Sequence, residues 1–124
     1  MPFPFTNGDV LSASDMNALN RLPPTIDTGT SRTLALSDES TWISKQASGN
    51  MTITIPPNSS VAFEIGAQIL IGRNTSAGVT IARGSGVGLI GVLGDKDYTI
   101  ANQDGFVTLL KGATNTWYIM GDVA

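Results

Sequence analysis

The sequence contains neither cysteine nor histidine. Without cysteine, the chain can form no disulfide bond and can offer no thiolate to a metal ion. Without histidine, it lacks the commonest general base at neutral pH and the commonest ligand of transition metals. We therefore expect no thiolate or imidazole metal site and no acid–base chemistry that depends on an imidazole ring.

Charged side chains are also scarce. They make up 14% of the residues, whereas about 25% is typical of soluble domains. The net charge is −3 and the basic residues occur singly, so the sequence lacks the basic cluster that would neutralise nucleic-acid phosphates. A polar but nearly uncharged surface suits a subunit interface or a particle better than a free cytosolic enzyme. The alternative is a plain β protein rich in threonine and glycine.

Long apolar runs are missing. No segment has the length of a membrane span, so we expect no membrane insertion. The opening MPFPFTNGD has neither the basic start nor the apolar run of a secretory signal. At 124 residues and 12.9 kDa, the sequence fits one domain with a short appendage.

What the sequence does contain is a repeated strand pattern. Met51, Ile53 and Ile55 alternate with threonines, which is typical of a half-buried strand. Pro56 and Pro57 cannot donate to a sheet, so they end that strand. The alternation of Val61, Phe63 and Ile65 predicts a strand over 61–65. Further strands are expected around 33–36, 42–46, 69–71, 79–81, 87–89, 98–100, 107–110 and 117–120.

Short strands with turn signals every eight to twelve residues are typical of a sandwich or barrel. The turns leave no room for crossover helices, which argues against parallel pairing. We therefore expect a mainly β fold: a small antiparallel β-sandwich or jelly-roll-like domain over residues 25–124, with an extended N-terminal arm and one short helix.

Residues 1–24 are expected to form a separate arm. The two Phe–Pro alternations of residues 1–11 favour extended backbone. The pattern of residues 12–22, SASDMNALNRL, predicts a helix that Pro23 and Pro24 end. Such a segment cannot bury Phe3 and Phe5 by itself, so they either pack against the domain or dock into a partner.

No residue pattern indicates a catalytic, cofactor or metal site. Gly84, Gly86 and Gly88 lie in RGSGVGLIG, where a strand-like run follows instead of the helix that a dinucleotide site requires. Asp95 and Asp97 provide two oxygen ligands for calcium without the others at loop spacing. The remaining carboxylates lie mostly in predicted turns, where aspartate serves local hydrogen bonding, and nothing in their pattern indicates a glycosidase pair. We expect no enzyme and no cofactor.

The aromatic residues and one loop offer candidates for recognition. Trp117 shares its strand face with Ile119, which predicts that it belongs to the core, whereas Tyr118 points to the opposite face. The turn that follows the double proline presents Asn58 and Ser59. We therefore take Asn58, Ser59 and Tyr118 as candidates for surface recognition.

Two stretches of the chain resemble bacteriophage tail-fibre and related virion proteins. The first is PFPFTNGDVLSASDMNALN, an aromatic-rich lead, a glycine turn and a short helix of the pattern Ser/Thr-Ala-x-Asp-x-Asn. The second covers residues 33–124 and is marked by TLALSDES, TITIPPNSSVAFEIGAQI and LLKGATNTWYIMGDV. The motifs occur in the order typical of that family.

The resemblance implies a virion component, most often homotrimeric, assembled in the host cytoplasm. Residues 1–24 would attach to another virion protein, and the β domain would face outward or toward a host-surface glycan. The particle-docking residues would be Phe3, Phe5, Leu11, Met16 and Leu19. The chain lacks the long repetitive shaft of a typical fibre, so a short tail fibre and a capsid decoration or cement protein both remain open. A carbohydrate-binding module or depolymerase fragment is a third alternative.

Overall fold

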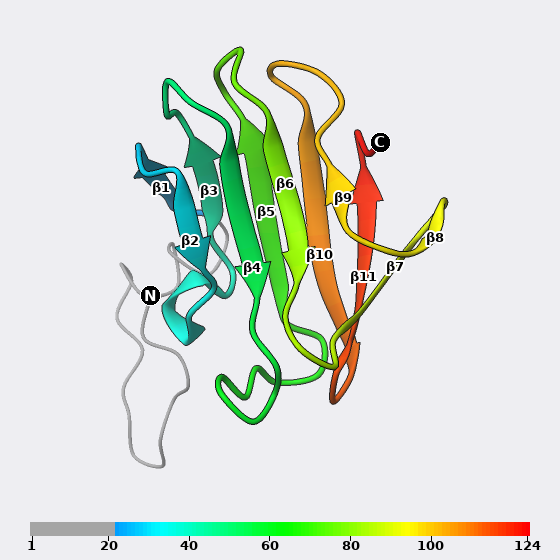
Figure 1. The fold of residues 1–124 in the computed structure, drawn as a ribbon. Helices are drawn as coiled ribbons and strands as arrows, with labels where there is room; N and C mark the ends of the chain where they lie inside the picture. Colours follow the sequence, from blue (N-terminus) through cyan, green and yellow to red (C-terminus); the bar gives the residue numbers. More distant parts are fainter. Residues whose placement is uncertain (1–21) are drawn as a thin grey trace, which may run out of the picture.

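The computed structural model describes residues 22–124, which form two β-sheets that face each other (Figure 1). Sheet A has the strand order β1-β3-β5-β10-β11-β7-β8, and sheet B has the order β2-β4-β6-β9. The strands of sheet A are β1 (Pro24–Asp27), β3 (Trp42–Lys45), β5 (Gln68–Arg73), β7 (Gly88–Gly91), β8 (Gly94–Asp95), β10 (Phe106–Ala113) and β11 (Thr116–Gly121). Those of sheet B are β2 (Ser31–Thr33), β4 (Met51–Ile55), β6 (Val79–Arg83) and β9 (Tyr98–Thr99).

The first six strands alternate between the two sheets, so the chain runs as a succession of coils (Figure 1). Strands β1, β3 and β5 are parallel neighbours in sheet A, and β2, β4 and β6 are parallel neighbours in sheet B. A strand in one sheet connects two strands that are neighbours in the other sheet: β2 of sheet B, for example, connects β1 and β3 of sheet A. A strand of the opposite sheet thus provides the long return connection that parallel pairing requires.

The expected antiparallel arrangement is therefore wrong for five of the nine strand pairings in the described part of the chain. The expectation assumed that only a helix could return the chain, whereas here residues 28–41 return it from β1 to β3 through sheet B. The antiparallel strand pairs of the described residues are β5–β10, β10–β11, β6–β9 and β7–β8, and an isolated antiparallel bridge joins Ile100 to Val123. The mainly β, sandwich-like fold is confirmed.

The core lies between the sheets, where the alternating apolar side chains of both meet. Ile43 and Ile71 of sheet A and Ile53 and Ile81 of sheet B are fully buried. Burial of each such side chain stabilises the fold by roughly 1.5–3 kcal/mol. Trp117 is buried as predicted, and the ring of Phe63 meets it edge-on with centroids 5.3 Å apart.

The predicted strand over 61–65 is wrong, because this segment is part of a loop between β4 and β5. Its backbone bonds are local: the amide of Val61 donates to the carbonyl of Pro57, and that of Phe63 to Val61. Phe63 enters the core, but Ile65 is 67% exposed. The strand expected over 33–36 is also misplaced: β2 covers Ser31–Thr33 and shares only Thr33 with the prediction, and a 3-10 turn, η1 (Leu36–Asp38), follows.

The predicted arm lies almost entirely outside the described residues, and so does the predicted helix except for its last residue, Leu22. The same holds for the predicted docking residues Phe3, Phe5, Leu11, Met16 and Leu19. Between residues 22 and 124 there is no helix of the length and hydrophobicity that a membrane span needs.

Candidate interaction surface

The outer face of sheet A carries large apolar side chains in rows that cross the strands. Strand register aligns Trp42, Leu70, Thr108 and Met120 in one row. A second row runs through Gln68, Leu110, Tyr118 and Ile90, and a third through Ile26, Ser44, Gly72 and Phe106. Sheet A is thus apolar on both faces, because its inner face also lines the core.

Two aromatic rings lie side by side on this face. Trp42 of β3 and Phe106 of β10 have ring centroids 5.8 Å apart and are tilted by 55°. The strand between them, β5, has Gly72 at the place where a Cβ atom would lie 2.5 Å from the ring of Phe106. The glycine therefore leaves the space that the phenyl ring occupies. The indole Nε1 of Trp42 is buried and has no hydrogen-bond acceptor in the structure.

The other half of the face is more open to solvent. Tyr118 is 42% exposed and Met120 is 46% exposed. Tyr118 lies over Gly112, where the ring edge would clash with any added Cβ atom. Tyr118 is accordingly on the outer surface, as predicted, but its neighbours in the rows are apolar rather than polar.

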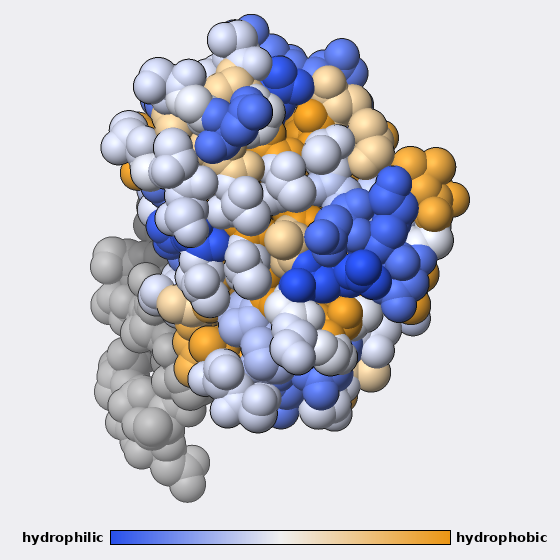
Figure 2. All heavy atoms as spheres, in the orientation of Figure 1, coloured by the Kyte–Doolittle hydropathy of each residue, from blue (hydrophilic) through white to orange (hydrophobic). Residues whose placement is uncertain are grey.

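The outer face of sheet B is different in kind. Its rows are Ser31, Thr52, Thr80 and Thr99, and Thr33, Thr54 and Ala82. Figure 2 shows this side of the molecule, where the atoms over β2, β4 and β6 are mostly pale or blue. Hydroxyl groups at the surface keep their water, so this face can remain solvated without a partner.

The predicted recognition residue Asn58 takes part in internal contacts. Its side-chain Oδ1 accepts a hydrogen bond from Nζ of Lys111 at 2.6 Å, and its backbone amide donates to Asn115 Oδ1 at 2.8 Å. Lys111 is 2% exposed, and its Nζ also donates to the carbonyl of Phe63 at 2.7 Å. Burial lowers the pKa of Lys111 below its ordinary 10.5, although the charge of Glu64 opposes this shift. Asn58 thus helps to hold the loop between β4 and β5.

Ser59, at the tip of the same loop, is exposed. Tyr118 lies on the outer face of sheet A, and no hydrogen bond or aromatic contact joins it to Ser59 in the described structure. The three residues predicted for recognition therefore divide into one internal residue, one exposed loop residue and one member of an apolar face.

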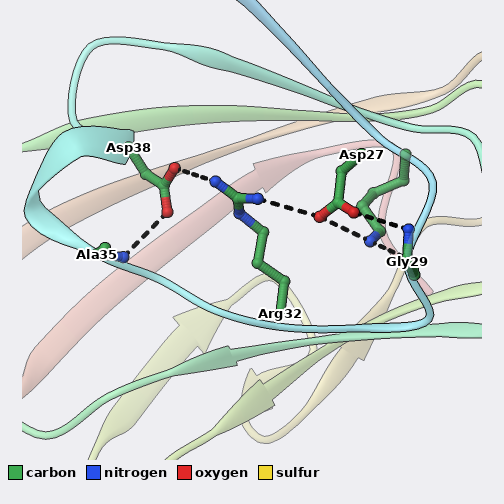
Figure 3. Close-up of polar contacts among 6 residues, drawn as sticks. Asp27, Gly29, Arg32, Ala35 and Asp38 are labelled. Carbon is green, nitrogen blue, oxygen red and sulfur yellow. Dashed lines mark hydrogen bonds and ion pairs between the residues drawn. The ribbon is translucent and has the colours of Figure 1, made fainter.

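A group of charged side chains lies between the sheets at the β1–β2 edge (Figure 3). Nζ of Lys45, which is fully buried, lies 3.0 Å from Oδ2 of Asp27 and donates to the carbonyl of Gly29 at 2.7 Å. The guanidinium of Arg32 contacts Asp27 at 3.2 Å and also pairs with Asp38. The network connects β1, β2, β3 and η1. It therefore links the first coil of the chain, which contains β1 and β2, to the second, which begins with β3.

The electrostatics of Asp27 follow from these contacts. Burial alone would raise the pKa of its carboxyl, but the hydrogen bonds from Lys45, Gly29 and Arg32 together bring the pKa below the ordinary 3.8. In the same way, Asp38 raises the pKa of Arg32, despite the opposing effect of burial. Each charged side chain in the network contacts one of opposite charge. We call this network a structural clamp, because it holds β1, β2, β3 and η1 together.

The described acidic side chains are engaged with neighbouring groups or lie apart from one another. Among residues 22–124, no group of three or more acidic side chains is placed to hold a metal ion. Asp95 and Asp97 both contact Arg83, at 3.1 and 3.0 Å, so their carboxylates are engaged at the surface. The arrangement that stands out is a neutral apolar face suited to association with another protein surface.

Sequence reasoning missed most of this face, although a signal was present. Trp42, Leu70, Phe106 and Met120 were not among the predicted site residues. The segments QILIGR and TWYIMG carry apolar residues at consecutive positions, which is typical of strands that are buried on both faces. No protein-family model matches this chain, and no curated protein matches it.

Proposed function

We propose that this chain is a structural protein of a phage particle, a short tail fibre or fibre-like appendage. Residues 1–24 attach it to another virion protein, and as a homotrimer it contributes to host attachment. The resemblance of the N-terminal stretch and of residues 33–124 to tail-fibre proteins supports this proposal. The observation that carries it furthest is the outer face of sheet A, where Ile90, Phe106, Tyr118 and Met120 are exposed, because large apolar side chains gathered on an exposed face are typical of interaction surfaces.

The division of the chain also supports the proposal. All strands of the described part of the chain lie within residues 24–121, so the two sheets described above are built from residues at and after the end of the proposed arm. That segment contains Phe3 and Phe5, whose burial requires a surface outside the segment itself. An apolar docking arm attached to a rigid β module is an arrangement that suits a particle appendage.

The attachment can be tested by removing residues 2–21 and measuring how much of the protein enters particles assembled in its presence. We expect the shortened chain to keep its β-sheet circular dichroism spectrum and to be absent from purified particles. A full-length chain with Phe3→Ser and Phe5→Ser should show the same defect, whereas Thr54→Ser on the outer face of sheet B should enter normally. Normal incorporation of the shortened chain would refute the attachment role.

A capsid decoration protein is the alternative that uses the same module. Both roles predict a particle-bound chain, and a density map of labelled particles separates them by the position of the label. Host contact is proposed for the loop tip at Ser59, because Asn58 is held by Lys111 and Asn115.

A further inference from the structure

We infer that the outer face of sheet A is the surface through which copies of this chain associate. The inference rests on the oligomeric part of the proposed function and names the contact that would produce it. The partner is a second copy of the same chain, which presents the same neutral apolar rows. The central residues are Trp42, Leu70, Leu110 and Met120, on strands β3, β5, β10 and β11.

The first argument is the contrast between the two outer faces. Along the row that begins at Trp42, sheet A presents tryptophan, leucine, threonine and methionine, whereas the sheet B row that begins at Ser31 presents only hydroxyl groups. Both faces are the outer sides of one sandwich. The difference in composition therefore indicates that the outer face of sheet B contacts water and that the outer face of sheet A contacts protein.

The second argument is charge. The three rows described on sheet A contain no charged side chain across β1, β3, β5, β10, β11 and β7. The next residue in register is Asp95 of the edge strand β8, whose carboxylate pairs with Arg83 at 3.1 Å. Charged groups near the face point elsewhere: Lys45 and Lys111 are turned into the sandwich, and Arg73 donates to backbone carbonyls. An uncharged face meets its own copy without repulsion between like charges, which a symmetric contact requires.

The third argument is an unpaired donor. The indole Nε1 of Trp42 lies at this face, is buried, and has no acceptor in the structure. A buried donor without an acceptor costs on the order of 1–3 kcal/mol, so such groups are normally satisfied. A small shift of the ring on association would bring the N–H to a carbonyl or hydroxyl oxygen of the adjoining copy.

The test measures the molar mass of the full-length protein by light scattering at micromolar concentration. We expect the wild type to have about three times the 12.9 kDa chain mass. Leu70→Lys places a charge at the middle of the face and should reduce the mass to that of one chain. Met120→Lys should do the same with less effect on folding, because Met120 is 46% exposed and a lysine there reaches water in a single chain.

Thr80→Lys is the matched control, since Thr80 occupies a central strand of sheet B and points outward from it. It should leave the mass unchanged, and circular dichroism should show the same β content in all variants. If Met120→Lys folds and keeps the wild-type mass, the inference is wrong. It is also wrong if removal of residues 2–21 alone gives the one-chain mass, because the arm would then hold the copies together.

These outcomes separate the inference from the proposed function. A wild-type protein that has the mass of one chain overturns the inference and the homotrimer together. A wild-type trimer that Met120→Lys dissociates, but that never enters particles, upholds the inference and refutes the phage role.

Discussion

At the scale of single residues, the buried cations account for much of the local architecture. Lys45 and Lys111 are both almost inaccessible to solvent, yet they serve different partners. Lys45 neutralises a carboxylate, whereas Lys111 donates to an amide oxygen and a backbone carbonyl. The sequence presents both as isolated lysines, and nothing in their neighbours distinguishes them from exposed ones.

Lys111→Met should destabilise the protein by about 1–3 kcal/mol, because the buried carbonyl of Phe63 loses its only described side-chain donor. The loop between β4 and β5 should also become more sensitive to proteolysis. Urea unfolding measures the first effect and limited digestion the second. Lys96→Met, at an exposed position, should change stability by no more than about 0.5 kcal/mol. If both variants unfold at the same urea concentration, the role given to Lys111 is wrong.

Asp27→Asn should remove a stabilisation that depends on pH. Because the pKa of Asp27 is lowered below 3.8 in the folded state, its contribution is fully present above pH 3.8 and is lost as the pH falls through the folded-state value. We expect the variant to be less stable at pH 7 by on the order of 3 kcal/mol, since the buried Lys45 loses its counter-ion.

The stability difference between the wild type and Asp27→Asn should shrink below pH 3.8, because the wild-type carboxylate then becomes protonated. Denaturant titrations at neutral and acidic pH give this comparison directly. Asp104→Asn, at an exposed position, is the control for a simple change of net charge. A difference that stays constant down to acidic pH would contradict the clamp.

At the scale of elements, the strands divide into those that the sequence predicts well and those that it does not. The alternation of Met51, Ile53 and Ile55 predicts β4 with its bounds, because one face of that strand is core and the other is solvent. The same alternation at Val61, Phe63 and Ile65 forms no strand. Lys111 and Asn115, which hold that loop, lie about fifty residues further along the chain, so no local pattern reveals them.

Whether neighbouring strands run parallel or antiparallel could not be predicted from the sequence, for a related reason. Alternation tells which face of a strand is buried, but it is the same for parallel and antiparallel neighbours. The candidate surface was partly predictable: Tyr118 was placed outside correctly, but Trp42 and Phe106 meet only because β5 brings β3 and β10 together. The contact depends on pairing that the pattern does not specify.

The central strand β5 provides a prediction of its own. Gly72→Ala should destabilise the protein by about 1–3 kcal/mol, because the new methyl group would overlap the ring of Phe106 and displace it from Trp42. Thermal unfolding measures the loss. In a Phe106→Ala background the same exchange should cost less, since the ring is gone. Gly49→Ala, which meets only an ordinary contact with Thr30, is the control. Equal costs in both backgrounds would contradict the steric explanation.

At the scale of the whole molecule, charge and apolar surface are kept apart. The ion pairs lie at the β1–β2 edge and around Arg83, and the outer rows of sheet A have none from β1 to β7; the one that borders them joins Arg83 to Asp95 of the edge strand β8. Association through that face should therefore depend on burial of apolar surface and hardly on electrostatic attraction.

We accordingly expect the oligomer to keep its mass when sodium chloride is raised from low concentration to about 1 M, where the screening length falls to about 3 Å. Sedimentation velocity over a salt series measures this. Low concentrations of urea, which weaken apolar contacts, should dissociate the oligomer before the chain unfolds. Dissociation by salt alone would indicate that charged groups hold the copies together, contrary to the surface proposed above.

The alternation of strands between the sheets has a consequence for how such a protein can change in length. Each coil adds one strand to sheet A and one to sheet B, so a duplicated coil would extend both sheets and leave every later pairing intact. On the far side, sheet A continues from β5 through the antiparallel strands β10 and β11 to β7 and β8, so the regular succession of coils ends at β6. The module can thus grow in one direction only, in steps of one coil, from the edge where the chain enters it.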